Sequence, residues 1–135
     1  MKSDLYLVDT SVWIDYLKAG TDLVDDRLDE LLALNQIACT GMVRLELLAG
    51  VRTEAEWRLV DEALSGTIWL RVEDETWTEA ARLGYELRRK GKTVPSTDLL
   101  IAATARRSSA TVLHKDRHYD VLAEELGLPV ESYVT

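Results

Sequence analysis

The sequence has a single cysteine, no long apolar run and no excess of basic residues, and each absence excludes a class of protein. Cys39 cannot form an internal disulfide, which favours the reducing cytoplasm. No apolar run approaches the roughly 20 residues that span a bilayer, and the N-terminus lacks a signal-peptide pattern. Acidic residues outnumber basic ones by 24 to 16, a net charge of −8. This charge argues against a protein that grips nucleic acid through a broad basic face, but not against one that binds phosphates through metal ions.

The rest of the composition is that of an ordinary globular protein. Apolar residues make up 47% of the 135 residues and charged residues 30%, which excludes a disordered chain. A chain of this length buries roughly two-thirds of its unfolded surface, and no linker, repeat or low-complexity segment divides it. We therefore expect one domain that spans residues 1–135.

Short apolar runs alternate along the chain with segments of helical periodicity. The runs predict strands at residues 5–8, 36–40, 68–70, 111–113 and 130–134. The periodic segments predict helices at residues 12–18, 22–32, 42–49, 53–64, 77–90, 97–105 and 121–126. Ser11 should cap the first helix and Gly20 should end it, and the fifth should bury a face made of Trp77, Ala80, Ala81, Gly84 and Leu87. This alternation predicts an α/β fold, a three-layer α/β/α sandwich with a mainly parallel central sheet.

The helix after Pro95 organises the rest of the chain. Ser96 or Thr97 can cap it through a side-chain oxygen. Residues 99–105 carry no charge, and a helix that is apolar on all sides is buried. Its acid, Asp98, lies in the first turn, where the positive end of the helix favours a carboxylate. A carboxylate at the tip of a buried helix needs a partner.

Three further acids lie where that partner is expected. Asp9 follows the first predicted strand, Glu46 lies on the helix after the second, and Asp116 follows the fourth. In a parallel α/β sheet the carboxyl ends of the strands and the N-termini of the returning helices share one edge, where such folds bind ligands. We therefore expect the four acids to converge on one site.

Four carboxylates in one pocket repel one another and cannot all stay ionised unaided. A divalent cation resolves the repulsion, and oxygen ligands with no histidine or cysteine nearby suit Mg²⁺ or Mn²⁺. Such a site has the parts of a metal-dependent phosphodiesterase, in which the metal polarises the phosphate and lowers the pKa of a bound water.

Each acid also lies in a distinctive motif. The motifs are LVDTSVWID at residues 7–15, RLELLAG at 44–50, TDLLIAATA at 97–105 and KDRHY at 115–119. In order, spacing and total length the chain resembles the PIN-domain ribonucleases, specifically the VapC toxins of bacterial toxin–antitoxin pairs. One departure is His114, at a position where relatives often carry Thr or Ser two residues before the last acid.

The resemblance implies an endoribonuclease that cuts single-stranded RNA with Mg²⁺ or Mn²⁺ as its cofactor. The catalytic and metal-binding residues would be Asp9, Glu46, Asp98 and Asp116, and the supporting residues Thr10, Ser11 and Ser96. The resemblance also implies a homodimer and a complex with a cognate antitoxin, whose tail lies in an apolar groove and usually inserts a basic side chain at the acids.

Lys115 and Arg117 flank the last acid and are the RNA-binding residues that we expect. The serious alternative is a PIN-like module that binds metal, RNA or a partner without cleaving RNA. Other α/β folds agree less well with the sequence. A phosphoacceptor receiver domain needs a second acid beside Asp9, and a nucleotide-binding Rossmann domain needs a glycine-rich phosphate loop.

Overall fold

The computed structural model describes residues 4–18 and 23–135. Within them the strands are β1 (Tyr6–Val8), β2 (Ile37–Thr40), β3 (Ile68–Leu70), β4 (Thr111–His114) and β5 (Val130–Ser132). The helices are α1 (Thr10–Leu17), α2 (Leu23–Ala33), α3 (Gly41–Ala49), α4 (Glu54–Ser65), α5 (Asp74–Arg89), α6 (Ser96–Arg107) and α7 (Arg117–Leu126). The predicted helix end at Gly20 and helix start at residue 22 lie outside the described residues.

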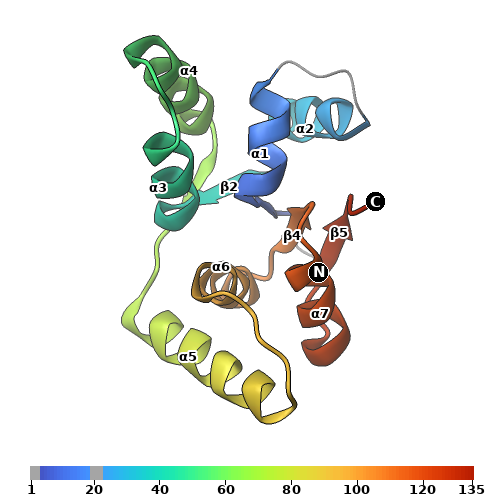
Figure 1. The fold of residues 1–135 in the computed structure, drawn as a ribbon. Coiled ribbons are helices and arrows are strands. Elements are labelled where there is room, and N and C mark those ends of the chain that lie inside the picture. Colours follow the sequence, from blue (N-terminus) through green and yellow to red (C-terminus); the bar gives the residue numbers. More distant parts are fainter. Residues whose placement is uncertain (1–3, 19–22) are drawn as a thin grey trace.

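The strands form a sheet in the order β3-β2-β1-β4-β5, and each neighbouring pair is parallel. Figure 1 shows α1 to α4 on one side of the sheet and α5 to α7 on the other. Right-handed crossovers produce this arrangement, because the chain moves outward from β1 to β3 and then returns through β4 to β5. The predicted three-layer α/β/α sandwich is therefore confirmed.

The helix predicted to be buried is α6, and every residue from Asp98 to Ala105 is buried. It packs against α5, where a Cβ added to Gly84 would come within 2.8 Å of Leu99 Cδ1. Glycine therefore permits the close approach of these two helices. In the part of the chain that the structure describes, no helix is long and apolar enough to span a membrane.

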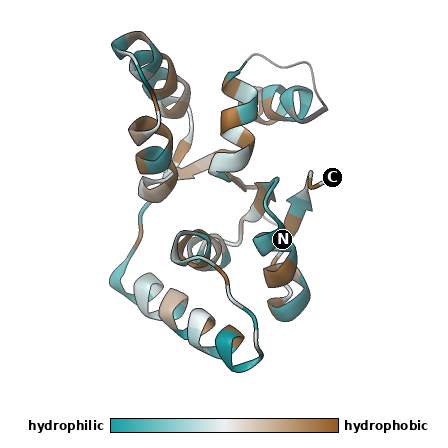
Figure 2. Cartoon of the chain, in the orientation of Figure 1, coloured by the Kyte–Doolittle hydropathy of each residue, from teal (hydrophilic) through white to brown (hydrophobic). Residues whose placement is uncertain are grey.

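The buried face of α5 differs from the prediction. It consists of Thr76, Ala80, Leu83 and Leu87, which follow the i, i+4, i+7, i+11 spacing of one helical stripe. Trp77, which was expected on this face, is 56% exposed. Ala80 and Leu87 of the predicted face are buried, but Trp77 and Ala81 turn to solvent and Thr76 and Leu83 take their place. The carboxyl end of α5 is strongly hydrophilic in Figure 2, in agreement with the basic ending of the predicted helix.

Two helix caps also differ from the prediction. The N-cap of α1 is Asp9, whose Oδ2 accepts the Ser11 N–H at 3.0 Å, so Ser11 lies inside the helix. The N-cap of α6 is Pro95, and no side-chain cap bond is made there. Ser96 and Thr97 cannot cap α6 because they are its first two helical residues.

Candidate active site

Three acids meet at the carboxyl edge of the sheet, beside β1 and β4, where the order of the strands reverses. Asp9 follows β1 and caps α1, and Asp116 follows β4 and caps α7. Asp98 approaches from the first turn of α6. Crevices at such reversal points bind ligands in open α/β sheets. The chain thus brings three carboxylates from distant segments to one ligand-binding edge.

Asp9 is held by hydrogen bonds on both of its carboxylate oxygens and is only 4% exposed. Oδ2 accepts the Ser11 N–H at 3.0 Å and the Ser11 Oγ–H at 2.6 Å. Oδ1 accepts the Tyr119 hydroxyl at 2.8 Å. Ser11 Oγ also accepts the Lys115 N–H at 3.1 Å, so Ser11 ties the end of β1 to the segment after β4.

Asp98 is nearly as buried, at 7% exposed, but has fewer donors. Its Oδ1 lies 3.4 Å from Thr97 Oγ1 and 3.5 Å from the Tyr119 hydroxyl, both long for hydrogen bonds. Its Oδ2 is buried and accepts no hydrogen bond from the described residues. His118 Nδ1 lies 3.4 Å from this oxygen. Asp98 therefore keeps a buried acceptor available.

Burial first, and then the nearby acids Asp116, Asp9 and Glu46, raise the pKa of Asp98 to about 8. For Asp116, burial also acts upward, but hydrogen bonds from Asp98 and His118 outweigh it and lower the pKa of this acid. Asp98 thus holds the proton of the pair near neutral pH and Asp116 holds the charge. The repulsion that the sequence predicted is relieved by a shared proton when no cation is bound.

His118 approaches the acids more closely than expected. Its Nδ1 lies 2.8 Å from Asp116 Oδ1, and its backbone N–H donates to the same oxygen at 2.9 Å. The expectation of a site with no histidine nearby is therefore wrong. The reason is that α7 begins at Arg117, four residues earlier than predicted, so its first turn brings His118 back over the N-cap.

His114, the departure from the family pattern, is fully buried beneath Asp116. Its Nδ1 accepts the Asp116 N–H at 3.1 Å, and its Nε2 lies 3.3 Å from Asp120 Oδ1. Burial lowers the pKa of His114, so the ring is neutral and can act as an acceptor. The ring lies 5.0 Å from that of Tyr119, tilted by 43°. His114 thus supports the pocket by fixing the backbone of Asp116.

Glu46 is exposed, on the rim of the site, whereas Asp9 and Asp98 are buried and Asp116 is half-buried. Its Oε1 accepts the Thr10 Oγ1–H at 2.9 Å, which joins α3 to the start of α1. Glu46 also lines a groove of about 510 Å³ between α1, α3 and α4, whose apolar walls include Ile14, Leu47 and Leu59. The fourth predicted acid therefore stands between the buried acids and an apolar groove.

The remaining predicted residues are Lys115, Arg117 and Ser96. Lys115 Nζ forms an ion pair with Asp15, and the Arg117 side chain is exposed at the start of α7. Ser96 is exposed and lines a separate cavity of about 360 Å³ between α5 and α6. No hydrogen bond from the Ser96 side chain to the acids occurs among the described residues.

Tyr119 is the site residue that the sequence analysis missed. It is fully buried, and its hydroxyl lies between Asp9 and Asp98. The signal was its place three residues after Asp116, one helical turn along α7. Because the helix was predicted to start near residue 121, Tyr119 lay outside it and the direction of its side chain could not be inferred.

The cluster has the donors of a cation site. Asp98, Asp116 and His118 each offer one ligand atom, and these atoms lie within 4.8 Å of one another. The buried Asp98 Oδ2 is an acceptor without a hydrogen bond among the described residues, which is costly unless a ligand satisfies it. The residues present therefore suit a divalent cation.

Comparisons with known proteins agree with this geometry. The family model of the PIN domain matches residues 6–125. VapC ribonuclease Mb1587 of Mycobacterium bovis is 31% identical over 133 residues, which cover 96% of this chain and 99% of the relative.

Solved structures with the same fold come from toxin–antitoxin systems. A DNA-bound VapBC from Salmonella typhimurium superposes with a TM-score of 0.81 at 20% identity, covering 98% of each chain. VapBC-5 from Mycobacterium tuberculosis, a member of the VapBC family of toxin–antitoxin systems, superposes with a TM-score of 0.69 at 25% identity, covering 98% of this chain and 99% of the other.

Proposed function

Because the chain belongs to the PIN-domain family and its relatives include VapC ribonucleases, we propose that it is an endoribonuclease, the toxin of a toxin–antitoxin pair. The observation that carries the proposal is the convergence of Asp9, Asp98 and Asp116 at the strand-reversal edge. Asp98 is a buried acid whose ionisation its surroundings oppose, an arrangement that a bound cation would stabilise. Single-stranded RNA is the proposed substrate.

We propose Mg²⁺ or Mn²⁺ as the cofactor, held by Asp98 and Asp116 of the ligand cluster together with Asp9, which the family resemblance adds as a ligand. When bound, such an ion supplies charge for the phosphate and activates water for attack. A bound cation would favour the ionised form of Asp98, so its affinity would rise with pH through the pKa of about 8. The backbone N–H of His118 donates to Asp116 Oδ1 and helps to orient that carboxylate.

Cleavage of RNA tests this function directly. The purified chain should cut a mixed panel of single-stranded RNAs in the presence of Mg²⁺ or Mn²⁺, and a chelator should stop the cleavage, because the acids alone repel a phosphate. Fragment analysis by electrophoresis is the measurement. Binding of the panel without cleavage, in the presence of either ion, would instead support the non-cleaving module.

RNA affinity should depend on Lys115 and Arg117 more than on Arg106 and Arg107, because the first pair flanks Asp116 and the second lies at the far end of α6. Neutralising Lys115 and Arg117 to Gln should flatten the slope of log affinity against log salt by up to about 1.4, at roughly 0.7 per phosphate contact. The Lys115–Asp15 ion pair should hold the change below that limit. Neutralising Arg106 and Arg107 is the matched control and should leave the slope unchanged. The reverse result would place the RNA at the opposite edge of the sheet.

We propose that the groove between α1, α3 and α4 receives the antitoxin. Its walls include the exposed apolar side chains Ile14 and Leu59, which an apolar segment would cover. Glu46 lies at the groove and at the rim of the acids. A basic antitoxin side chain placed there would face Glu46, as the family resemblance implies. The same resemblance supports a homodimer as the unit that binds the antitoxin.

A further inference from the structure

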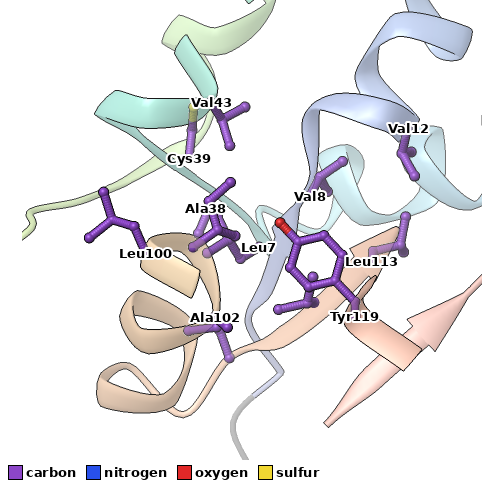
Figure 3. Close-up of a cluster of buried hydrophobic side chains, with 14 of the residues drawn as sticks. Leu7, Val8, Val12, Ala38, Cys39, Val43, Leu100, Ala102, Leu113 and Tyr119 are labelled. Atoms are coloured by element: carbon purple, nitrogen blue, oxygen red, sulfur yellow. The ribbon is translucent and has the colours of Figure 1, made fainter. Parts of the chain in front are cut away.

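The hydroxyl of the buried Tyr119 side chain reaches the acidic cluster from the hydrophobic core. In Figure 3 the ring of Tyr119 lies among the core side chains Leu7, Val8 and Leu113, and its hydroxyl points away from α7. The hydroxyl donates to Asp9 Oδ1 at 2.8 Å and lies 3.5 Å from Asp98 Oδ1. The phenol hydroxyl therefore offers a hydrogen-bond donor between Asp9 and Asp98 without adding a charge to the site.

The contacts of Asp9 leave few directions for a ligand. A carboxylate oxygen has about two acceptor sites. Both sites of Oδ2 are taken by the N–H and the hydroxyl of Ser11. Tyr119 takes one site of Oδ1, which leaves one site on this oxygen, whose phenol donor also lies 3.5 Å from Asp98 Oδ1. The hydroxyl thus fixes both the rotation of the Asp9 carboxylate and the oxygen that it offers.

The Tyr119 ring is itself held in place. It packs against His114 with ring centroids 5.0 Å apart, and His114 Nδ1 accepts the Asp116 N–H. The two packed rings therefore contact both acids: Tyr119 bonds the side chain of Asp9, and His114 bonds the backbone N–H of Asp116. Burial, followed by the charge of Asp9, raises the pKa of Tyr119 well above its usual value, so the hydroxyl remains a donor.

We infer that Tyr119 is a positioning residue of the cation site, whose hydroxyl fixes Asp9 so that Oδ1 is presented toward Asp98. This inference rests on the proposed function, since it concerns the cation that the function requires. Hydrogen bonds to a metal-binding carboxylate orient it, and losing one typically costs 10- to 100-fold in metal affinity or activity.

Tyr119→Phe tests the inference, because it removes the hydroxyl and keeps the buried ring. We expect the dissociation constant for Mn²⁺, measured by calorimetry on the metal-free chain, to rise by about 10-fold. The Mn²⁺ concentration that gives half-maximal RNA cleavage should rise by a similar factor, while kcat at saturating Mn²⁺ changes less. Tyr16→Phe is the matched control: it removes another phenol-to-carboxylate bond, from Tyr16 to Asp29 at 2.6 Å, and should leave Mn²⁺ affinity unchanged.

A double-mutant cycle with Asp9→Asn separates positioning from a general loss of packing. If Tyr119 acts through Asp9, Tyr119→Phe should change Mn²⁺ affinity by less than twofold in the Asp9→Asn background. Equal effects in both backgrounds, or Mn²⁺ affinity of Tyr119→Phe equal to or above that of the wild type, would overturn the inference. Because Mn²⁺ binding is measured without RNA, a wild type that binds Mn²⁺ but cuts no RNA contradicts the proposed function alone. A wild type that binds no Mn²⁺ overturns both.

Discussion

Asp9→Asn and Asp98→Asn should each lower the rate of RNA cleavage by on the order of 10²-fold or more, the scale for losing one group that stabilises charge in the transition state. Each change removes a carboxylate that would be ionised in the cation-bound site and keeps the size of the side chain. Asn caps helices about as well as Asp, so Asp9→Asn should keep α1 in place. Initial rates of cleavage at saturating Mg²⁺ or Mn²⁺ are the measurement.

The same variants should lose toxicity. Expression of the wild type without an antitoxin should arrest growth, and expression of either variant should not. Asp61→Asn is the matched control, since Asp61 pairs with Arg44 outside the acidic cluster and is not part of the proposed site. Growth arrest by Asp9→Asn as strong as that by the wild type would place the activity elsewhere in the molecule.

The features of the fold that were predicted correctly are those that a local pattern determines. Short apolar runs and helical stripes indicated the parallel sheet, and the uncharged run after Asp98 indicated the buried helix α6. Placing the acids needed only one additional rule, that the carboxyl ends of parallel strands share an edge. Asp9 and Asp116 therefore followed from the order of the elements.

The features that were missed depend on a few residues at the ends of elements. Starting α7 near residue 121 rather than at Arg117 concealed the inward direction of Tyr119 and the return of His118 over Asp116. Ser11 was read as a cap, although the acid before it takes that role. Helix ends are decided by competition among neighbouring capping groups, which a periodic pattern does not resolve. At this site those ends carry the acids, so small errors there removed the contacts that support them.

Asp98→Asn should stabilise the cation-free protein at pH 8, although it damages the proposed site. The pKa of Asp98 is about 8 in the fold against 3.8 for a free carboxyl, so the protonated form is favoured in the folded state. Its contribution to stability is complete below pH 3.8 and is lost as the pH rises through 8. Asparagine does not ionise, so the variant does not lose this stability as the pH rises. We expect its free energy of unfolding at pH 8 to exceed that of the wild type by about 2 kcal/mol, less than the full shift would give because Asp116 gains charge stabilisation from the same proton.

Thermal unfolding across pH 4 to 8, with and without cation, measures both the stability of the cation-free protein and its stabilisation by the cation. The difference in Tm between variant and wild type should shrink toward pH 4, where Asp98 is protonated in the fold and a large fraction of it is also protonated in the unfolded chain. Millimolar Mg²⁺ or Mn²⁺ should raise the Tm of the wild type, since a ligand that binds the folded state stabilises it by mass action. The cation should raise the Tm of Asp98→Asn by less, because an uncharged amide replaces the buried carboxylate oxygen Oδ2.

A variant less stable than the wild type at pH 8 would show that the neighbouring acids do not destabilise the ionised form of Asp98 in the cation-free protein. If neither Mg²⁺ nor Mn²⁺ changes the Tm of the wild type, the proposed cation site is wrong.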